Sequence, residues 1–150
     1  MKKGWMFWVV VVFLAGIGAA AAQSSDLEDT GTCRLEILVT GFDTDQGKAK
    51  LALVNSRESF ASEDAQFMGI NSPVINRQAR LTLNIPCGEY AVKVFHDENG
   101  NDKLDTRIFG IPAERYGFSN NARGTLGPPD FSDARFVLDT AEHAISIEVK

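Results

Sequence analysis

The amino-acid sequence predicts an all-β domain. Apolar and polar side chains alternate with a period of two in five segments after residue 30, as expected for strands that bury one face. The connections are rich in Gly, Pro, Asn and Asp, which favour turns, and no long helical period follows residue 22. These features predict an antiparallel β-sandwich of about seven strands, immunoglobulin-like or transthyretin-like, with one long ordered loop.

The first two strands are expected over 33–41 and 48–55. Leu35, Ile37 and Val39 share one face of the first, and the second repeats this alternation. Because a turn signal over 43–47 separates them, we expect these two strands to form an antiparallel hairpin.

The middle of the chain holds a connection and three further strands. Residues 56–70 lack a strand pattern, and Ser62 is expected to cap a short helical turn there. Strands are expected over 73–75, at a sheet edge, then over 79–85 and 89–96. The alternation of the last of these places His96 on the core face.

The long loop is expected over 106–132, between the strand pattern of 89–96 and those of 133–139 and 143–150. It contains four glycines and three prolines but also four aromatic residues, which disordered segments lack. We therefore expect an ordered loop packed by its own side chains. The aromatic residues are Phe109, Tyr116, Phe118 and Phe131.

The N-terminus predicts export. Residues 1–22 have a basic start, an apolar middle and an Ala-Ala-Ala end, which is typical of a signal peptide, with a retained membrane anchor as the alternative. We expect a flexible leader over 23–32 and the β-sandwich domain over 33–150. The predicted location is the periplasm or the exterior, with no stable membrane insertion after cleavage.

The net charge and the two cysteines limit the partners and the cysteine chemistry that we expect for the exported chain. The net charge of −5 becomes −7 when Lys2 and Lys3 are removed, which disfavours nucleic acid as a partner and favours cations. Cys33 and Cys87 are the only cysteines. In an exported protein a disulfide between them is expected, and a metal-binding cysteine pair is the alternative.

The segment from Asp97 to Asp105 is the candidate metal site. Calcium prefers oxygen ligands, which alternate residues of one loop can supply. The predicted set is Asp97, Asn99, Asn101, the carbonyl group of Lys103, and Asp105. The sixth position is Asp102 where calcium loops have Gly, and the twelfth is Ile108 where they have Glu, so Glu114 is a candidate to complete a weak site. The alternative is a turn without metal, because Asn99-Gly100 is a strong turn signal.

Two further functions are weighed against a metal-stabilised module. A small hydrolase would use His96 with Glu114, or with Ser119 as nucleophile, although His96 also fits a packed core residue. A carbohydrate- or peptide-binding protein would use the long loop. Its predicted ligand contacts are Asn120, Asn121 and Arg123.

Three linked motifs carry a resemblance to a known family. They are Phe-His-Asp-Glu-Asn-Gly-Asn-Asp-Lys-Leu-Asp at 95–105, Gly-Ile-Pro-Ala-Glu at 110–114 and Tyr-Gly-Phe-Ser-Asn-Asn-Ala at 116–122. With them the chain resembles an exported bacterial family catalogued as domain of unknown function 2141. The resemblance implies a bacterial, periplasmic or secreted protein with no assigned activity. We therefore predict a non-catalytic binding or structural module of the bacterial envelope, whose partner is a carbohydrate or a protein.

Overall fold

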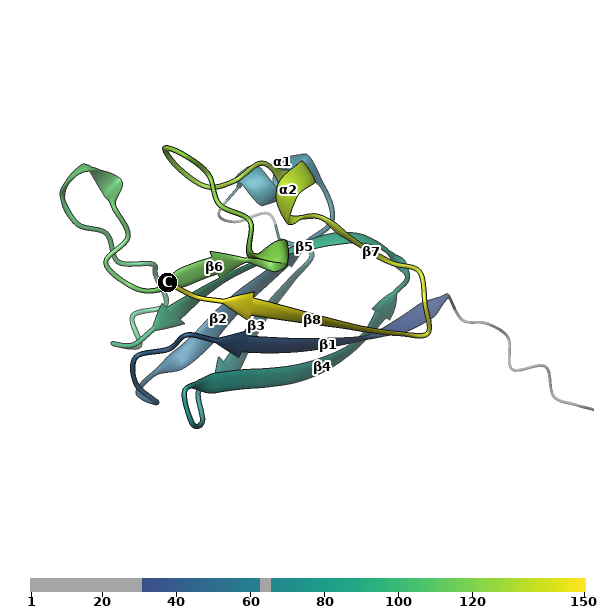
Figure 1. The fold of residues 1–150 in the computed structure, drawn as a ribbon, viewed down its shortest axis with the longest axis horizontal. Helices are drawn as coiled ribbons and strands as arrows, with labels where there is room; N and C mark the ends of the chain where they lie inside the picture. Colours follow the sequence, from purple (N-terminus) through teal and green to yellow (C-terminus); the bar gives the residue numbers. More distant parts are fainter. Residues whose placement is uncertain (1–30, 63–65) are drawn as a thin grey trace, which may run out of the picture.

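The computed structural model describes residues 31–62 and 66–150, so the predicted signal peptide and most of the predicted leader lie outside the described residues. The described chain is an all-β sandwich, as predicted, with eight strands in two sheets (Figure 1). The strands are β1 (Thr32–Thr40), β2 (Lys48–Val54), β3 (Met68–Pro73), β4 (Gln78–Pro86), β5 (Gly88–Asp97), β6 (Tyr116–Phe118), β7 (Phe136–Leu138) and β8 (Glu142–Glu148). The helices are α1 (Arg57–Ala61), η1 (Ile108–Gly110), η2 (Ser119–Asn121) and α2 (Phe131–Ala134).

The smaller sheet has the order β4-β1-β8, and the larger has β3-β2-β5-β6 with β7 paired to the other end of β5. The predicted hairpin of the first two strands is therefore wrong, because β1 pairs with β4 and β8 whereas β2 pairs with β3 and β5. The 43–47 turn crosses between the sheets. The pairing of β1 with β8 is parallel, in an otherwise antiparallel fold.

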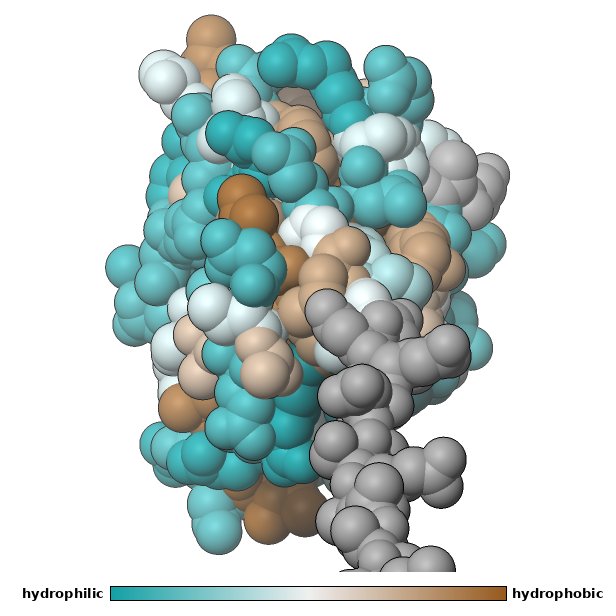
Figure 2. All heavy atoms as spheres, turned by 90° about the vertical axis from the view of Figure 1, so that its right-hand side faces the viewer, coloured by the Kyte–Doolittle hydropathy of each residue, from teal (hydrophilic) through white to brown (hydrophobic). Residues whose placement is uncertain are grey.

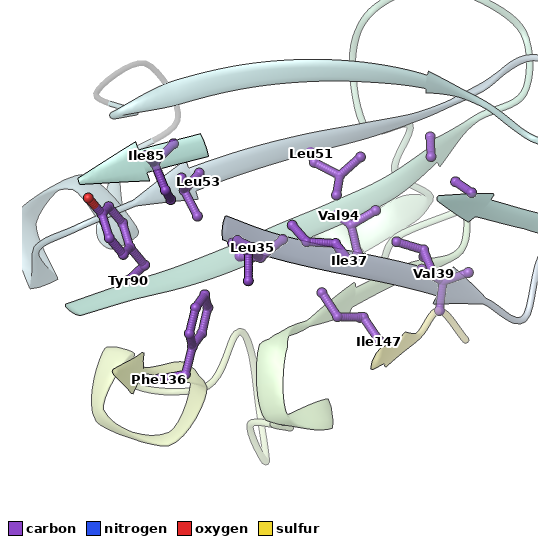
Figure 3. Packing of buried hydrophobic residues seen from close by; sticks show 14 of the residues in the cluster. Leu35, Ile37, Val39, Leu51, Leu53, Ile85, Tyr90, Val94, Phe136 and Ile147 are labelled. Atoms are coloured by element: carbon purple, nitrogen blue, oxygen red, sulfur yellow. The ribbon is translucent and has the colours of Figure 1, made fainter. Parts of the chain in front are cut away.

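The main core lies between the two sheets. Leu35, Ile37 and Val39 of β1 point toward Leu51 and Leu53 of β2 (Figure 3). All five are at most 3% exposed, and each side chain of this size contributes about 1.5–3 kcal/mol when it is buried. The alternation that predicted the strands thus also gave their inward faces.

A second apolar cluster covers the outer face of the larger sheet. Its buried members are Val54, Phe60, Ala91, Phe118 and Ala134. Helices α1 and α2 supply two of them, and Figure 1 shows both helices on this side of the sheet. The helix expected from Ser62 begins earlier, because Ser56 is the N-cap and forms a capping box with Ser59, while Ser62 ends the helix.

A close backbone contact joins the two sheets at the β6–β8 edge. The amide of Tyr116 donates to the carbonyl oxygen of Lys150 at 3.2 Å, and the amide of Lys150 donates back at 3.1 Å. Gly117 makes this approach possible, because a Cβ atom there would lie 3.0 Å from the Glu148 carbonyl oxygen. The C-terminus is consequently bound to the strand that follows the candidate site.

Cys33 and Cys87 form the predicted disulfide, with a Cα–Cα distance of 5.1 Å. It ties the start of β1 to the residue after β4, where these strands already pair. Figure 2 shows one face of the molecule, on which hydrophilic residues predominate and several apolar side chains lie among them. None of the helices within the described ranges is long and apolar enough to cross a membrane.

Candidate functional site

The candidate site is the loop 97–105 at the end of β5. Asp97 is the last residue of that strand and lies opposite Lys48, the first residue of β2. Gly47 has φ +73° and packs so closely that a Cβ atom there would overlap the carbonyl oxygen of Asp97. Only glycine avoids both the strained conformation and this overlap, so the 43–47 turn packs directly against the base of the loop.

The carboxylate of Asp97 organises the first half of the loop. It is fully buried, and its Oδ1 accepts hydrogen bonds from the amides of Gly100 at 2.9 Å and Asn101 at 3.1 Å. Its Oδ2 accepts a third from the amide of Asp102 at 3.1 Å. Three successive N–H groups thus converge on one side chain, which satisfies the buried charge and winds the loop around it.

Two lysines of β2 hold the side chain of Asp102 on the outside of the loop. The Oδ1 atom of Asp102 lies 2.7 Å from Lys48 Nζ and 2.8 Å from Lys50 Nζ. These hydrogen bonds, first from Lys48 and then from Lys50, lower the pKa of Asp102 from 3.8 to about 2. Lys48 Nζ also lies 3.6 Å from Asp97 Oδ2. The lysines therefore neutralise much of the charge of the loop at this point.

Asp105 closes the second half of the loop. The side-chain amides of Asn99 and Asn101 both donate to its carboxylate. Their oxygen atoms are also used, because Asn99 Oδ1 accepts from the amide of Asn101 at 3.0 Å and Asn101 Oδ1 accepts from the amide of Lys103 at 2.8 Å. The structure thus brings together all five predicted metal-binding positions in one hydrogen-bonded loop.

Glu114 joins the loop from the next segment of the chain. Its Oε1 accepts from the amide of Glu98 at 3.2 Å and its Oε2 from the amide of Asp105 at 3.1 Å. It therefore fixes both ends of the loop. Beside it lies an open hollow of about 520 Å³, lined by Gln46, Glu98, Asn99, Asp105, Ala113 and Glu114.

The donor set has the chemistry that calcium prefers, and its spacing matches a calcium loop at the odd positions up to the ninth. Every predicted ligand atom is an oxygen, and Asp102 has φ +65°, so it supplies the sharp turn that glycine supplies at the sixth position of calcium loops. The loop oxygens are engaged in hydrogen bonds, and the described residues hold no cluster of three or more His, Cys, Asp or Glu side chains arranged around a metal. The calcium site stays a prediction, because the side-chain oxygens of Asp97, Asn99, Asn101, Asp105 and Glu114 would have to bind the ion beside or in place of their present hydrogen-bond donors.

His96 is a packed core residue with one polar contact. It is 3% exposed, its Nε2 atom lies 2.7 Å from the carbonyl oxygen of Gln46, and its ring meets the Phe42 ring edge-on at 4.9 Å. The hydrogen bonds of the Glu114 carboxylate go to the loop backbone instead. No hydrogen bond joins His96 to Glu114 among the described residues.

Ser119 is equally enclosed. It has no exposed surface, its hydroxyl donates to the carbonyl oxygen of Ala134, and its oxygen accepts from the amide of Val92 at 2.9 Å. The hydroxyl therefore links η2, α2 and β5. These contacts describe a structural link between elements.

The three predicted ligand contacts in the long loop each bind the backbone of a neighbouring element. Asn120 Nδ2 donates to the carbonyl oxygens of Asp133 and Arg135 at 3.1 and 2.8 Å. Asn121 Oδ1 accepts from the amide of Glu148 at 2.8 Å, and Arg123 donates to the Glu148 carbonyl at 3.1 Å. Their role in ligand binding stays a prediction, and a ligand would compete with these bonds.

Lys48 and Lys50 are not among the site residues predicted from the sequence. Their spacing does indicate that they share the face opposite Ala49 and Leu51. This spacing does not show that the two lysines lie beside the 97–105 loop, however. Their position there follows from the register in which β2 pairs with β5. Residues on a neighbouring strand are thus the part of the site that spacing along the chain does not show.

Comparison with known proteins gives one match. A family model with the description "Uncharacterized protein conserved in bacteria (DUF2141)" matches residues 37–146. The matched range contains the whole 97–105 loop, Glu114 and the long segment that follows. No curated protein and no solved structure matches the chain.

Proposed function

The chain belongs to the bacterial family DUF2141, as its three motifs indicated, and we propose that it is a non-catalytic binding module of the bacterial envelope stabilised by calcium. The observation that carries the proposal is the winding of the 97–105 loop around Asp97, with Asp102 in the left-handed conformation. This is the backbone course that a single calcium loop needs when its sixth residue makes the sharp turn.

The orientation of Asp102 supports the proposal further. Its carboxylate points to Lys48 and Lys50 and leaves the inner side of the loop to the odd-numbered residues. The twelfth position is filled by Ile108, which is 78% exposed and carries no ligand atom. Glu114 is the carboxylate that approaches the loop from outside it, and we assign the closing ligand to it.

The role assigned to calcium is order. Glu114 and Asp105 stand at the base of the hairpin that begins the 106–132 segment, where the Ala113 amide donates to the Asp105 carbonyl oxygen at 2.7 Å. An ion shared by these carboxylates would hold the segment to the end of β5. The segment, with Asn120, Asn121 and Arg123, is the surface that we assign to an envelope carbohydrate or protein.

The test is the melting temperature of the protein in excess calcium and in chelator. A ligand that binds only the folded state stabilises it by mass action, by about 2.7 kcal/mol at a concentration of 100 times Kd. We expect a higher melting temperature with calcium, and a weak Kd of about 10⁻⁴–10⁻³ M as in other extracellular modules.

Matched variants locate the ion. Asp105→Asn and Glu114→Gln should abolish the calcium-dependent rise, whereas Asp139→Asn, which removes an exposed carboxylate after β7, should retain it. Equal melting temperatures of the wild-type protein in calcium and in chelator would contradict the proposal.

A further inference from the structure

The hairpin tip at 107–111 exposes three large apolar side chains. Ile108, Phe109 and Ile111 are 78%, 95% and 60% exposed. We expected the aromatic residues of the long loop to pack it, and Tyr116, Phe118 and Phe131 do join the outer cluster. Phe109 does not, and that expectation is wrong for it. We call residues 107–111 the apolar finger.

The apolar finger is held in place by backbone pairing. Thr106 and Pro112 form a bridge, the Arg107 amide donates to the Ile111 carbonyl oxygen at 2.6 Å, and the Gly110 amide donates to the Arg107 carbonyl at 3.1 Å. Phe109 itself has φ +66° and ψ +21°, a conformation that costs a residue with a large side chain about 1–2 kcal/mol. The hairpin thus holds the phenyl ring in solvent, although both the backbone conformation of Phe109 and the exposure of its apolar surface are unfavourable.

Cationic side chains without ion pairs flank the finger. Arg107 begins it and Lys103 precedes its stem, and neither forms an ion pair with another described residue. Of the neighbouring acids, Asp102 is paired with two lysines, whereas Asp105 accepts hydrogen bonds from two neutral asparagine amides. The finger therefore combines apolar side chains with two cations that have no ion-pair partner among the described residues.

The position of the finger on the molecule indicates which kind of partner it contacts. It projects from the sandwich in Figure 1, and the loop that carries Leu126, which is fully exposed, projects from the same side. Polar side chains predominate in the two open hollows beside the 43–47 turn and the 97–105 loop, so neither hollow suits an apolar tip from a second copy of the chain. A projecting apolar tip with cations at its base suits the headgroup region of a lipid bilayer.

We propose that the apolar finger binds reversibly to an anionic phospholipid membrane, with Phe109 entering the boundary between headgroups and acyl chains and Arg107 meeting the phosphates. Such contact is peripheral, because one short hairpin does not span a bilayer. It would place the domain at a membrane surface.

The test is co-sedimentation of the exported protein with vesicles of phosphatidylglycerol and phosphatidylethanolamine. A chelator is present, so that calcium contributes nothing and failure of the calcium proposal does not affect the result. We expect binding to these vesicles and much weaker binding to phosphatidylcholine vesicles. Phe109→Asn should lower the partition coefficient about tenfold, the effect of losing one apolar side chain from the interface. Arg107→Gln should lower it about fivefold.

Separate control variants test whether a loss of binding comes from misfolding or from the loss of any exposed apolar side chain. Asn tolerates positive φ, so Phe109→Asn should melt no lower than wild type. Val137→Ser removes an apolar side chain that is 44% exposed on β7 and should leave vesicle binding unchanged. In Phe109→Trp the introduced indole is the only one outside residues 1–22, and its emission should shift to shorter wavelength on the vesicles.

Three results would overturn the proposal. The first is absence of wild-type binding to anionic vesicles, and the second is equal binding by wild type and Phe109→Asn. The third is a lipid-free dimer that Phe109→Asn dissociates, which would assign the finger to contact between copies of the chain.

Discussion

At the scale of single residues, Ser119 is a buried polar side chain whose hydroxyl links two other elements of the fold. It bridges the Val92 amide and the Ala134 carbonyl with no exposure to solvent. Ser119→Ala removes both bonds and leaves two buried backbone groups unpaired, so the free energy of unfolding should fall by about 1–3 kcal/mol.

Urea unfolding measures this change. Ser146→Ala, an exposed serine of β8, is the matched control and should change stability by no more than about 0.5 kcal/mol. An unchanged unfolding midpoint for Ser119→Ala would show that water or a shifted backbone replaces the hydroxyl.

The sequence could predict which residues of the site lie together only where they belong to the same loop. The alternating oxygen-bearing residues from Asp97 to Asp105 share a loop as expected, and Glu114 meets it. Phe109 could not be placed, because an aromatic side chain in a glycine-rich segment has the same pattern whether it is packed or exposed. Its positive φ depends on the hairpin pairing around it.

At the scale of elements, the link between β2 and the 97–105 loop depends on ionisation of Asp102. Its folded pKa of about 2 lies below the ordinary 3.8, so folding favours the carboxylate form. This contribution to stability is complete above pH 3.8 and is lost as the pH falls toward 2.

Asp102→Asn isolates the charge, because Asn adopts positive φ without difficulty. We expect wild type to melt above Asp102→Asn at neutral pH and the two to converge as the pH approaches 2, measured by thermal unfolding across this range. If the difference in melting temperature between wild type and Asp102→Asn stayed constant with pH, the ion pairs of Asp102 with Lys48 and Lys50 would not be its cause.

The faces of the strands followed from the sequence, whereas their partners did not. The alternation in β1 and β2 assigns inward side chains correctly, but it is satisfied equally by a hairpin or by two facing sheets. A turn such as 43–47 that packs against Asp97 has the same residue types as one that joins paired strands. Strand pairing depends on contacts between residues remote in sequence, and these contacts cannot be predicted from a local alternation of apolar and polar residues.

At the scale of the whole molecule, the disulfide restricts the unfolded chain. Cys33 and Cys87 are 54 positions apart and enclose most of β1 and all of β2, α1, β3 and β4. Closing such a loop removes conformational entropy from the unfolded state and stabilises the fold by about 2–4 kcal/mol. The double variant Cys33→Ala, Cys87→Ala should therefore unfold at lower urea concentration.

The comparison is made under non-reducing conditions, with wild type treated with reductant as a second measurement. The reduced wild type and the double variant should agree. A double variant as stable as the oxidised protein would contradict this contribution of the disulfide to stability.

The parallel pairing of β8 with β1 has a consequence for the order in which the molecule is made. β1 is the first strand of the domain and β8 the last, yet they are neighbours over seven residue pairs. A chain synthesised from its N-terminus holds β1 without this partner until β8 has been synthesised. Because contacts so remote in sequence form late, the smaller sheet is completed only after β8 has been made.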